Sequence, residues 1–153
     1  MTENPAMPSP DPALRVLDKL VGTWELTGRF VGAAEDGVSG RATFRWLPGG
    51  FFLEQRISLD FMGMPIESTE LVGYDPQTQS LESRVYSNMS PVPLPYHWKV
   101  DSETVQITVK YGPLDATFTG SWSGDTMTGG WRPNDGADQS VNVPYDLQGV
   151  RVG

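Results

Sequence analysis

The hydrophobic period of this chain changes within one short stretch, Leu17-Asp18-Lys19-Leu20-Val21-Gly22-Thr23-Trp24. Before Gly22, apolar residues recur at helical intervals, which predicts one short amphipathic helix carrying Leu14, Leu17, Leu20 and Val21. Asp11 suits the cap of its first turn and Pro12 suits its first helical position, while Gly22 suits its end. From Trp24 onward the period is two, which is typical of a β-strand with one buried face.

Alternation of apolar and polar residues continues through most of the remaining chain, as in residues 105–111. Turn-forming residues such as Gly112-Pro113 separate the alternating runs at intervals of about 8–12 residues, the spacing of meander hairpins. We predict about ten strands, the last of them spanning Val141 to Val152. No helical pattern is long enough for a crossover between parallel strands, so the strands are expected to be antiparallel.

An antiparallel sheet of about ten short strands must close on itself or split into two layers, since open edges promote aggregation. We predict an all-β, antiparallel up-and-down β-barrel, because a meander of hairpins closes most simply in that way. The short N-terminal helix favours the barrel over its competitor, a two-sheet sandwich, because it can close one end of a barrel. Residues 1–10 are expected to form a flexible tail and residues 11–153 a single barrel domain.

The acidic composition narrows the range of partners. A formal net charge of -8 repels phosphate backbones and anionic lipid headgroups, so neither nucleic acid nor a membrane is expected as a partner. The chain has no Cys, which excludes disulfides and Cys-based zinc sites. Its first residues lack the basic start and apolar run of a signal peptide, so we expect a cytoplasmic protein. The composition leaves open whether the chain forms a homodimer.

Three motifs carry a resemblance to a known family: Gly22-Thr23-Trp24, residues 46–53 and residues 73–78. Together they resemble a bacterial family of uncharacterised lipocalin-like (calycin) barrels that is distantly related to the haem-binding nitrobindins. The resemblance implies a barrel with an internal cavity, in which Trp24 packs across the base beside the preceding helix. It implies no settled activity.

The resemblance to nitrobindins can be compared residue by residue. Nitrobindins hold haem iron through a His near the last strand, whereas the last strand of this chain contains no His. The one His, His97, falls on the polar face of another strand. Haem binding is therefore the least favoured alternative, and we expect no cofactor and no metal site.

Aromatic residues on the apolar strand faces serve either as ordinary core or as the wall of a ligand cavity. A barrel of about ten strands is wide enough for both uses. We assign Trp24 to the base and predict that a cavity is lined by Gln55, Ile57, Tyr86, Trp98, Phe118 and Trp122. Gln55 is the polar exception on its face, and a hydrogen bond to a neighbouring side chain or a buried water is the favoured explanation for it.

The strands expected over residues 66–75 and 81–88 carry polar residues on both faces, so their orientation stays undecided. If Glu70, Arg84 and Tyr86 point inward, they form a charged and phenolic cluster that can act in proton transfer. An exposed ion pair between Glu70 and Arg84 is the slightly favoured alternative. Of the three residues, Tyr86 is the one most expected to reach the interior.

These observations predict a non-covalent binder of a small, mainly apolar or aromatic ligand. The alternative is a cofactor-free enzyme, an isomerase, cyclase or hydrolase, that acts on a hydrophobic metabolite in the same cavity. In that case Glu70, Arg84 and Tyr86 are the catalytic candidates.

Overall fold

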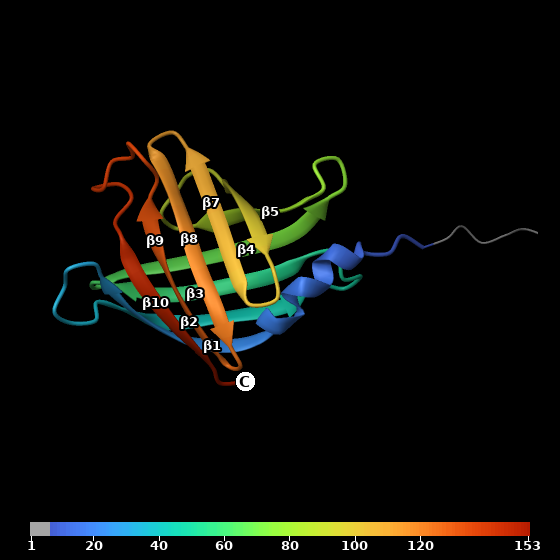
Figure 1. The fold of residues 1–153 in the computed structure, drawn as a ribbon, viewed down its shortest axis with the longest axis horizontal. Coiled ribbons are helices and arrows are strands. Elements are labelled where there is room, and N and C mark those ends of the chain that lie inside the picture. Colours follow the sequence, from blue (N-terminus) through green and yellow to red (C-terminus); the bar gives the residue numbers. More distant parts are fainter. Residues whose placement is uncertain (1–6) are drawn as a thin grey trace, which may run out of the picture.

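The computed structural model describes residues 7–153 and consists of one short helix followed by ten strands (Figure 1). The helix is η1 (Pro12–Leu20), and the strands are β1 (Gly22–Phe30), β2 (Val38–Trp46), β3 (Leu53–Phe61), β4 (Met64–Asp75), β5 (Ser80–Ser87), β6 (Leu94–Val100), β7 (Thr104–Tyr111), β8 (Leu114–Ser123), β9 (Thr126–Pro133) and β10 (Tyr145–Arg151). Of the predicted tail, residues 1–6 lie outside the described part of the chain.

All ten strands join in one closed barrel in the order β1-β10-β9-β8-β7-β6-β5-β4-β3-β2. Strands that follow one another in the sequence pair antiparallel, and β10 returns to β1, where Arg151 lies opposite Trp24. The predicted antiparallel up-and-down barrel is therefore confirmed, and the competing two-sheet sandwich is excluded.

The helix η1 begins where the sequence predicts but is wound more tightly than an α-helix. Asp11 caps it by accepting a hydrogen bond from the backbone N–H of Ala13 at 2.8 Å. Since η1 is a 3-10 helix, three residues complete one turn, and the leucines at positions 14, 17 and 20 share one buried face. Val21, predicted on that face, caps the end of the helix and is exposed, so that detail is wrong. Within residues 7–153, no helix has the length and apolar character required to cross a membrane.

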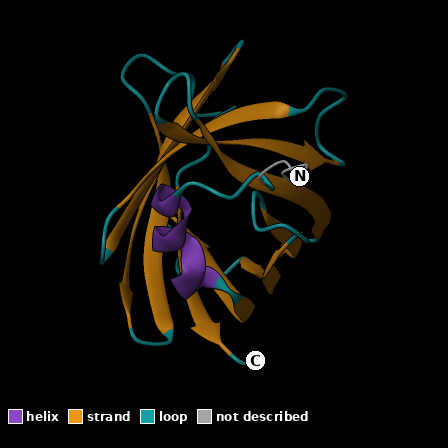
Figure 2. Ribbon diagram, turned by 90° about the vertical axis from the view of Figure 1, so that its right-hand side faces the viewer, coloured by secondary structure: helices purple, strands orange, loops and turns teal. Residues whose placement is uncertain are grey.

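The buried face of η1 covers one end of the barrel, which we call the closed end (Figure 2). The indole N–H of Trp24 donates to the carbonyl of Leu20 at 2.9 Å. Arg151 donates to the carbonyl of Lys19 at 2.5 Å, and its guanidinium carbon lies 4.5 Å from the centre of the Trp24 ring. The first and last strands are therefore both fastened to the helix at this end.

The opposite end, which we call the open end, consists of the loops at residues 31–37, 62–63, 88–93, 112–113 and 134–144. The last strand begins at Tyr145 rather than at Val141, so the predicted start is wrong. The reason is Asn142, whose buried side chain accepts from the Asp115 N–H at 2.8 Å and donates to the Pro113 carbonyl at 3.0 Å. These bonds hold the segment before Tyr145 as a loop.

Candidate functional site

The barrel encloses a cavity of about 750 Å³ that extends from the closed end to the loops of the open end. Alternate residues of every strand line it, because successive side chains of a strand point to opposite faces. Most of the lining is aliphatic or aromatic. Glu70 is the only charged side chain among the lining residues, which include no Lys, Arg, His or Asp from the described part of the chain.

Glu70 lies midway along β4 and is only 6% exposed. The Ser83 hydroxyl donates to its Oε2 at 2.5 Å, and the Trp98 indole N–H donates to the same oxygen at 3.0 Å. Trp98 also approaches the Ser83 hydroxyl oxygen at 3.1 Å, so the three side chains form one hydrogen-bonded cluster. We call Glu70, Ser83 and Trp98 the carboxylate cluster.

The environment of Glu70 moves the ionisation of its carboxyl group to near neutral pH. Burial raises the pKa of its carboxyl group to about 7, because the charged form loses its hydration. The hydrogen bonds from Ser83 and Trp98 oppose that rise by stabilising the carboxylate. A carboxyl group with this pKa can exchange a proton at physiological pH and can carry a charge when a partner stabilises it.

Strand register explains how these side chains meet. Glu70 lies opposite Gln55 of β3 on one side and Val85 of β5 on the other. Ser83, two residues before Val85, shares its inward face and lies opposite Tyr96 of β6. The cluster therefore rests on three consecutive hairpin-connected strands, β4, β5 and β6.

Aromatic side chains surround the carboxylate cluster. Burial, with smaller contributions from Glu70 and Tyr145, raises the pKa of the Tyr96 hydroxyl above its ordinary value. Burial raises the pKa of Tyr145 to about 12. The ring centres of Tyr96 and Trp131 are 5.7 Å apart, and those of Phe118 and Trp131 are 5.5 Å apart. Both phenols stay neutral at physiological pH and can exchange hydrogen bonds with a neighbour.

Most residues that the sequence predicted for a cavity wall do line this cavity: Gln55, Ile57, Trp98, Phe118 and Trp122. Trp24 lies at the closed end and reaches the same cavity. Their roles toward a ligand remain predictions. Their placement follows from the period of two, which was clear on these strands.

Two predicted site residues lie elsewhere. Arg84 is exposed and Tyr86 is 53% exposed, because both occupy the outward positions of β5 while Ser83 and Val85 point inward. The inward placement of Tyr86 is therefore wrong, and the cluster of Glu70, Arg84 and Tyr86 does not form. The alternative ion pair does not form either, since Glu70 is buried and bonded to Ser83.

Ser83 and Tyr96 were not predicted as site residues. A signal existed for Ser83, which is the polar residue between Leu81 and Val85 on the face that turned inward. Tyr96 lies on the apolar face of the alternating run 96–100, and nothing in the sequence connects it with Glu70.

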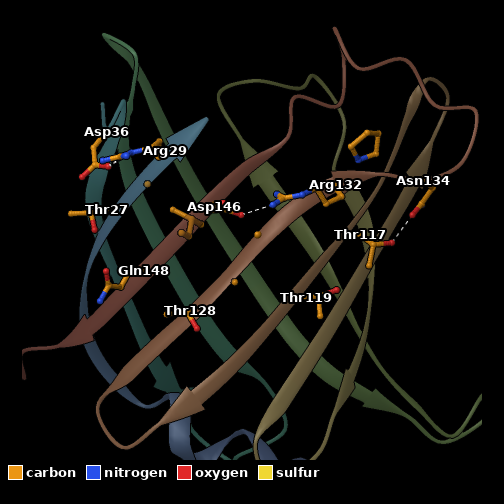
Figure 3. Close-up of a pocket in the computed structure, with 15 residues that line it drawn as sticks. Thr27, Arg29, Asp36, Thr117, Thr119, Thr128, Arg132, Asn134, Asp146 and Gln148 are labelled. Atoms are coloured by element: carbon orange, nitrogen blue, oxygen red, sulfur yellow. Dashed lines mark hydrogen bonds and ion pairs between the residues drawn. The ribbon is translucent and has the colours of Figure 1, made fainter. Parts of the chain in front are cut away.

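A second hollow, of about 660 Å³, lies on the outside of the barrel over β1, β8, β9 and β10 (Figure 3). Polar side chains line it, and its charges are paired: Arg29 with Asp36 at 2.9 Å and Arg132 with Asp146 at 2.6 Å. Figure 3 shows these pairs bridging neighbouring segments instead of pointing at a common centre. Because its charged groups already bind one another, this outer hollow is a weaker ligand candidate than the interior.

Comparisons with known proteins agree with the fold. The model of a protein family described as "Protein of unknown function (DUF1579)" matches residues 9–113, a range that includes the whole carboxylate cluster. The crystal structure of Rv2717c from M. tuberculosis is similar, with a TM-score of 0.63 and 13% sequence identity over 95% of this chain and 100% of that chain. At that identity the likeness concerns the fold alone. No curated protein matches the chain.

Proposed function

The chain belongs to the DUF1579 family of proteins of unknown function, and we propose that it binds a small, mainly apolar or aromatic molecule non-covalently inside the barrel. The observation that carries the proposal is the interior cavity of about 750 Å³. Cavities of roughly 300–1,000 Å³ with apolar walls and a few polar groups are typical of small-molecule sites.

The chemistry of the wall supports an apolar body for the ligand. Transfer of apolar surface from water to such a wall is favourable by about 25 cal/mol per Å². Trp98, Phe118 and Trp131 supply flat surfaces against which an aromatic ring can stack. The carboxylate cluster adds a polar group that can orient the ligand.

Ligand titration tests this proposal. We expect N-phenylnaphthylamine, an uncharged fluorescent probe, to bind saturably and to quench tryptophan emission. Ser68→Phe places a large ring in the cavity, since Ser68 lines it, and should weaken binding by about tenfold or more through steric exclusion. Ser121→Phe on the outer face of β8 is the matched control and should bind as the unmodified chain does. Equal binding by both variants would contradict a site inside the barrel.

A second candidate function rests on Glu70 alone. Its pKa of about 7 suits a general acid or base at neutral pH, as in a cofactor-free isomerase, cyclase or hydrolase acting on a hydrophobic metabolite. Hydrolysis of naphthyl acetate tests the hydrolase version. Enzymatic release of naphthol should disappear in Glu70→Gln and persist in Glu67→Gln, a change on the outer face of the same strand. Equal release by both variants contradicts this candidate.

We further propose that this family is a branch of the lipocalin-like (calycin) barrels with a distant relationship to nitrobindins. The placement of Gly22-Thr23-Trp24 directly after η1, with Trp24 at the closed end, supports that proposal. Haem binding does not follow from it. His97 is on the outer face, with its Nδ1 3.6 Å from Glu82 Oε1, and therefore cannot reach a group inside the barrel.

A further inference from the structure

We propose that the ligand of this barrel is an organic amine with an apolar or aromatic body, whose ammonium group binds Oε1 of Glu70. This inference rests on the proposed function and names the class of ligand. It also implies that the barrel discriminates against carboxylates of the same shape, including fatty acids.

One of the two oxygens of the Glu70 carboxylate has no hydrogen-bond donor from residues 7–153. Ser83 and Trp98 both donate to Oε2. No donor from residues 7–153 bonds Oε1, although Glu70 is buried and lines the cavity. Oε1 is not among the fully enclosed side-chain atoms, so a donor inside the cavity can reach it. The two fixed donors orient the carboxylate, and they leave its free oxygen for a donor that enters the cavity.

The described lining residues include no positive charge that could compensate Glu70. Arg84, next to the residue that faces Glu70 on β5, lies on the outer face. Arg45 and Arg56 also point outward, where they bind Glu54 at 2.8 Å and 3.3 Å. A ligand ammonium would compensate the charge of Glu70, whereas a ligand carboxylate would meet a like charge and no cation.

Aromatic rings form the cavity wall near the carboxylate cluster. Tyr96 and Trp98 both face inward from β6, and Trp131 lies across from Tyr96. The faces of such rings attract ammonium groups, and this attraction strengthens when water is excluded. The same rings accommodate the apolar body of the ligand, so one surface fits both the ring and the ammonium group of an arylalkylamine.

A matched series of ligands tests the inference. Naphthylethylamine, naphthylethanol and the carboxylate naphthaleneacetate share one aromatic body and differ in the polar group. Displacement of N-phenylnaphthylamine at pH 7.5 should give an amine affinity about tenfold or more above that of the alcohol, with the carboxylate weakest. A carboxylate that binds as tightly as the amine would overturn the inference.

Glu70→Gln separates charge from shape. The Gln amide oxygen can still accept from Ser83 and Trp98, so the variant should fold, which a thermal melt verifies. Amine affinity should fall about tenfold and carboxylate affinity should rise, because the like charge is gone. Glu67→Gln removes one charge from the outer face of the same strand and should leave the affinities of all three ligands unchanged.

The outcomes distinguish this inference from the proposed function. If N-phenylnaphthylamine binds in the cavity but amine and carboxylate bind alike, the amine inference is wrong and the binding function stands. If neither the probe nor any member of the series binds, the proposed function is wrong as well. The order of the three ligand affinities is measured on the unmodified chain, so the test holds even if Glu70→Gln fails to fold.

Discussion

The closed and open ends of the barrel differ in how their apolar residues are used. At the closed end, Leu14, Leu17 and Leu20 are almost completely buried, and side chains bind the carbonyls of η1. At the open end, the exposed apolar residues are between 37% and 73% accessible: Met62, Met64, Met89, Tyr111, Val141 and Val143. The closed end is therefore packed closely around η1, whereas the loops of the open end leave apolar side chains accessible.

Truncation to Ala should lower the free energy of unfolding far more at the closed end, in Leu17→Ala, than at the open end. Leu17 is 0% exposed, so truncation leaves a cavity and should lower the free energy of unfolding by about 2–5 kcal/mol. Val143→Ala at the open end should change it by less than about 0.5 kcal/mol. Urea denaturation of both variants measures the difference, and equal losses would contradict the contrast between the ends.

Glu70, between the two ends, should make stability depend on pH. Because its pKa is raised to about 7 in the folded chain, the unfolded chain releases this proton first as pH rises. The contribution of protonated Glu70 to the free energy of unfolding is complete below about pH 4.5 and is lost by about pH 7. The decrease amounts to about 3 kcal/mol. Glu54 and Asp101, whose pKa values are lowered, act in the opposite direction.

Comparison with Glu70→Gln separates the pH-dependent contribution of Glu70 to stability from the contributions of the other carboxyl groups. The difference in unfolding free energy between the two proteins should change steadily from pH 4.5 to pH 7. The variant should become the more stable of the two at the upper limit. A difference that does not vary with pH would show that Glu70 ionises normally in the folded chain.

A smaller effect is expected from Arg151→Met at the closed end. This change removes hydrogen bonds to the carbonyls of Lys19 and Val21 and the contact with the Trp24 ring. The loss should be about 1–3 kcal/mol, since the bonds are charge-assisted and partly buried. Arg132→Met removes an exposed ion pair and should cost at most about 1 kcal/mol, so a larger cost there would refute the ranking.

The smallest effect on stability should come from the open end itself. Met89 lines the cavity and is half exposed, so Met89→Ser should change the unfolding free energy by less than about 0.5 kcal/mol. The affinity for N-phenylnaphthylamine should nevertheless fall severalfold, because an apolar contact is lost. A variant that loses stability but not affinity would show that this end has a structural role.

The sequence predicted those parts of the fold where one signal dominated. Alternation on β7 and β8 placed Phe118 and Trp122 inside correctly, because each polar neighbour pointed out. The period of the helix was ambiguous, since leucines three apart fit both α and 3-10 geometry over so short a segment.

The central part of the candidate site could not be predicted from periodicity. β4 and β5 carry polar residues on both faces, so hydrophobicity alone did not orient Glu70 relative to Arg84. Their orientation depends on the register with β3 and β6, which is a property of the closed barrel. The meeting of Glu70 with Ser83 and Trp98 is a tertiary fact of the same kind.

The hydrogen bond between Arg151 and the Lys19 carbonyl joins groups that are 132 positions apart in the chain. Contacts between such distant residues raise the contact order, and proteins rich in them fold slowly. During synthesis the barrel cannot close until β10 has left the ribosome, so β1 lacks one of its two partner strands until then. Loss of the final seven-residue strand would leave two unpaired strand edges and an uncovered Trp24.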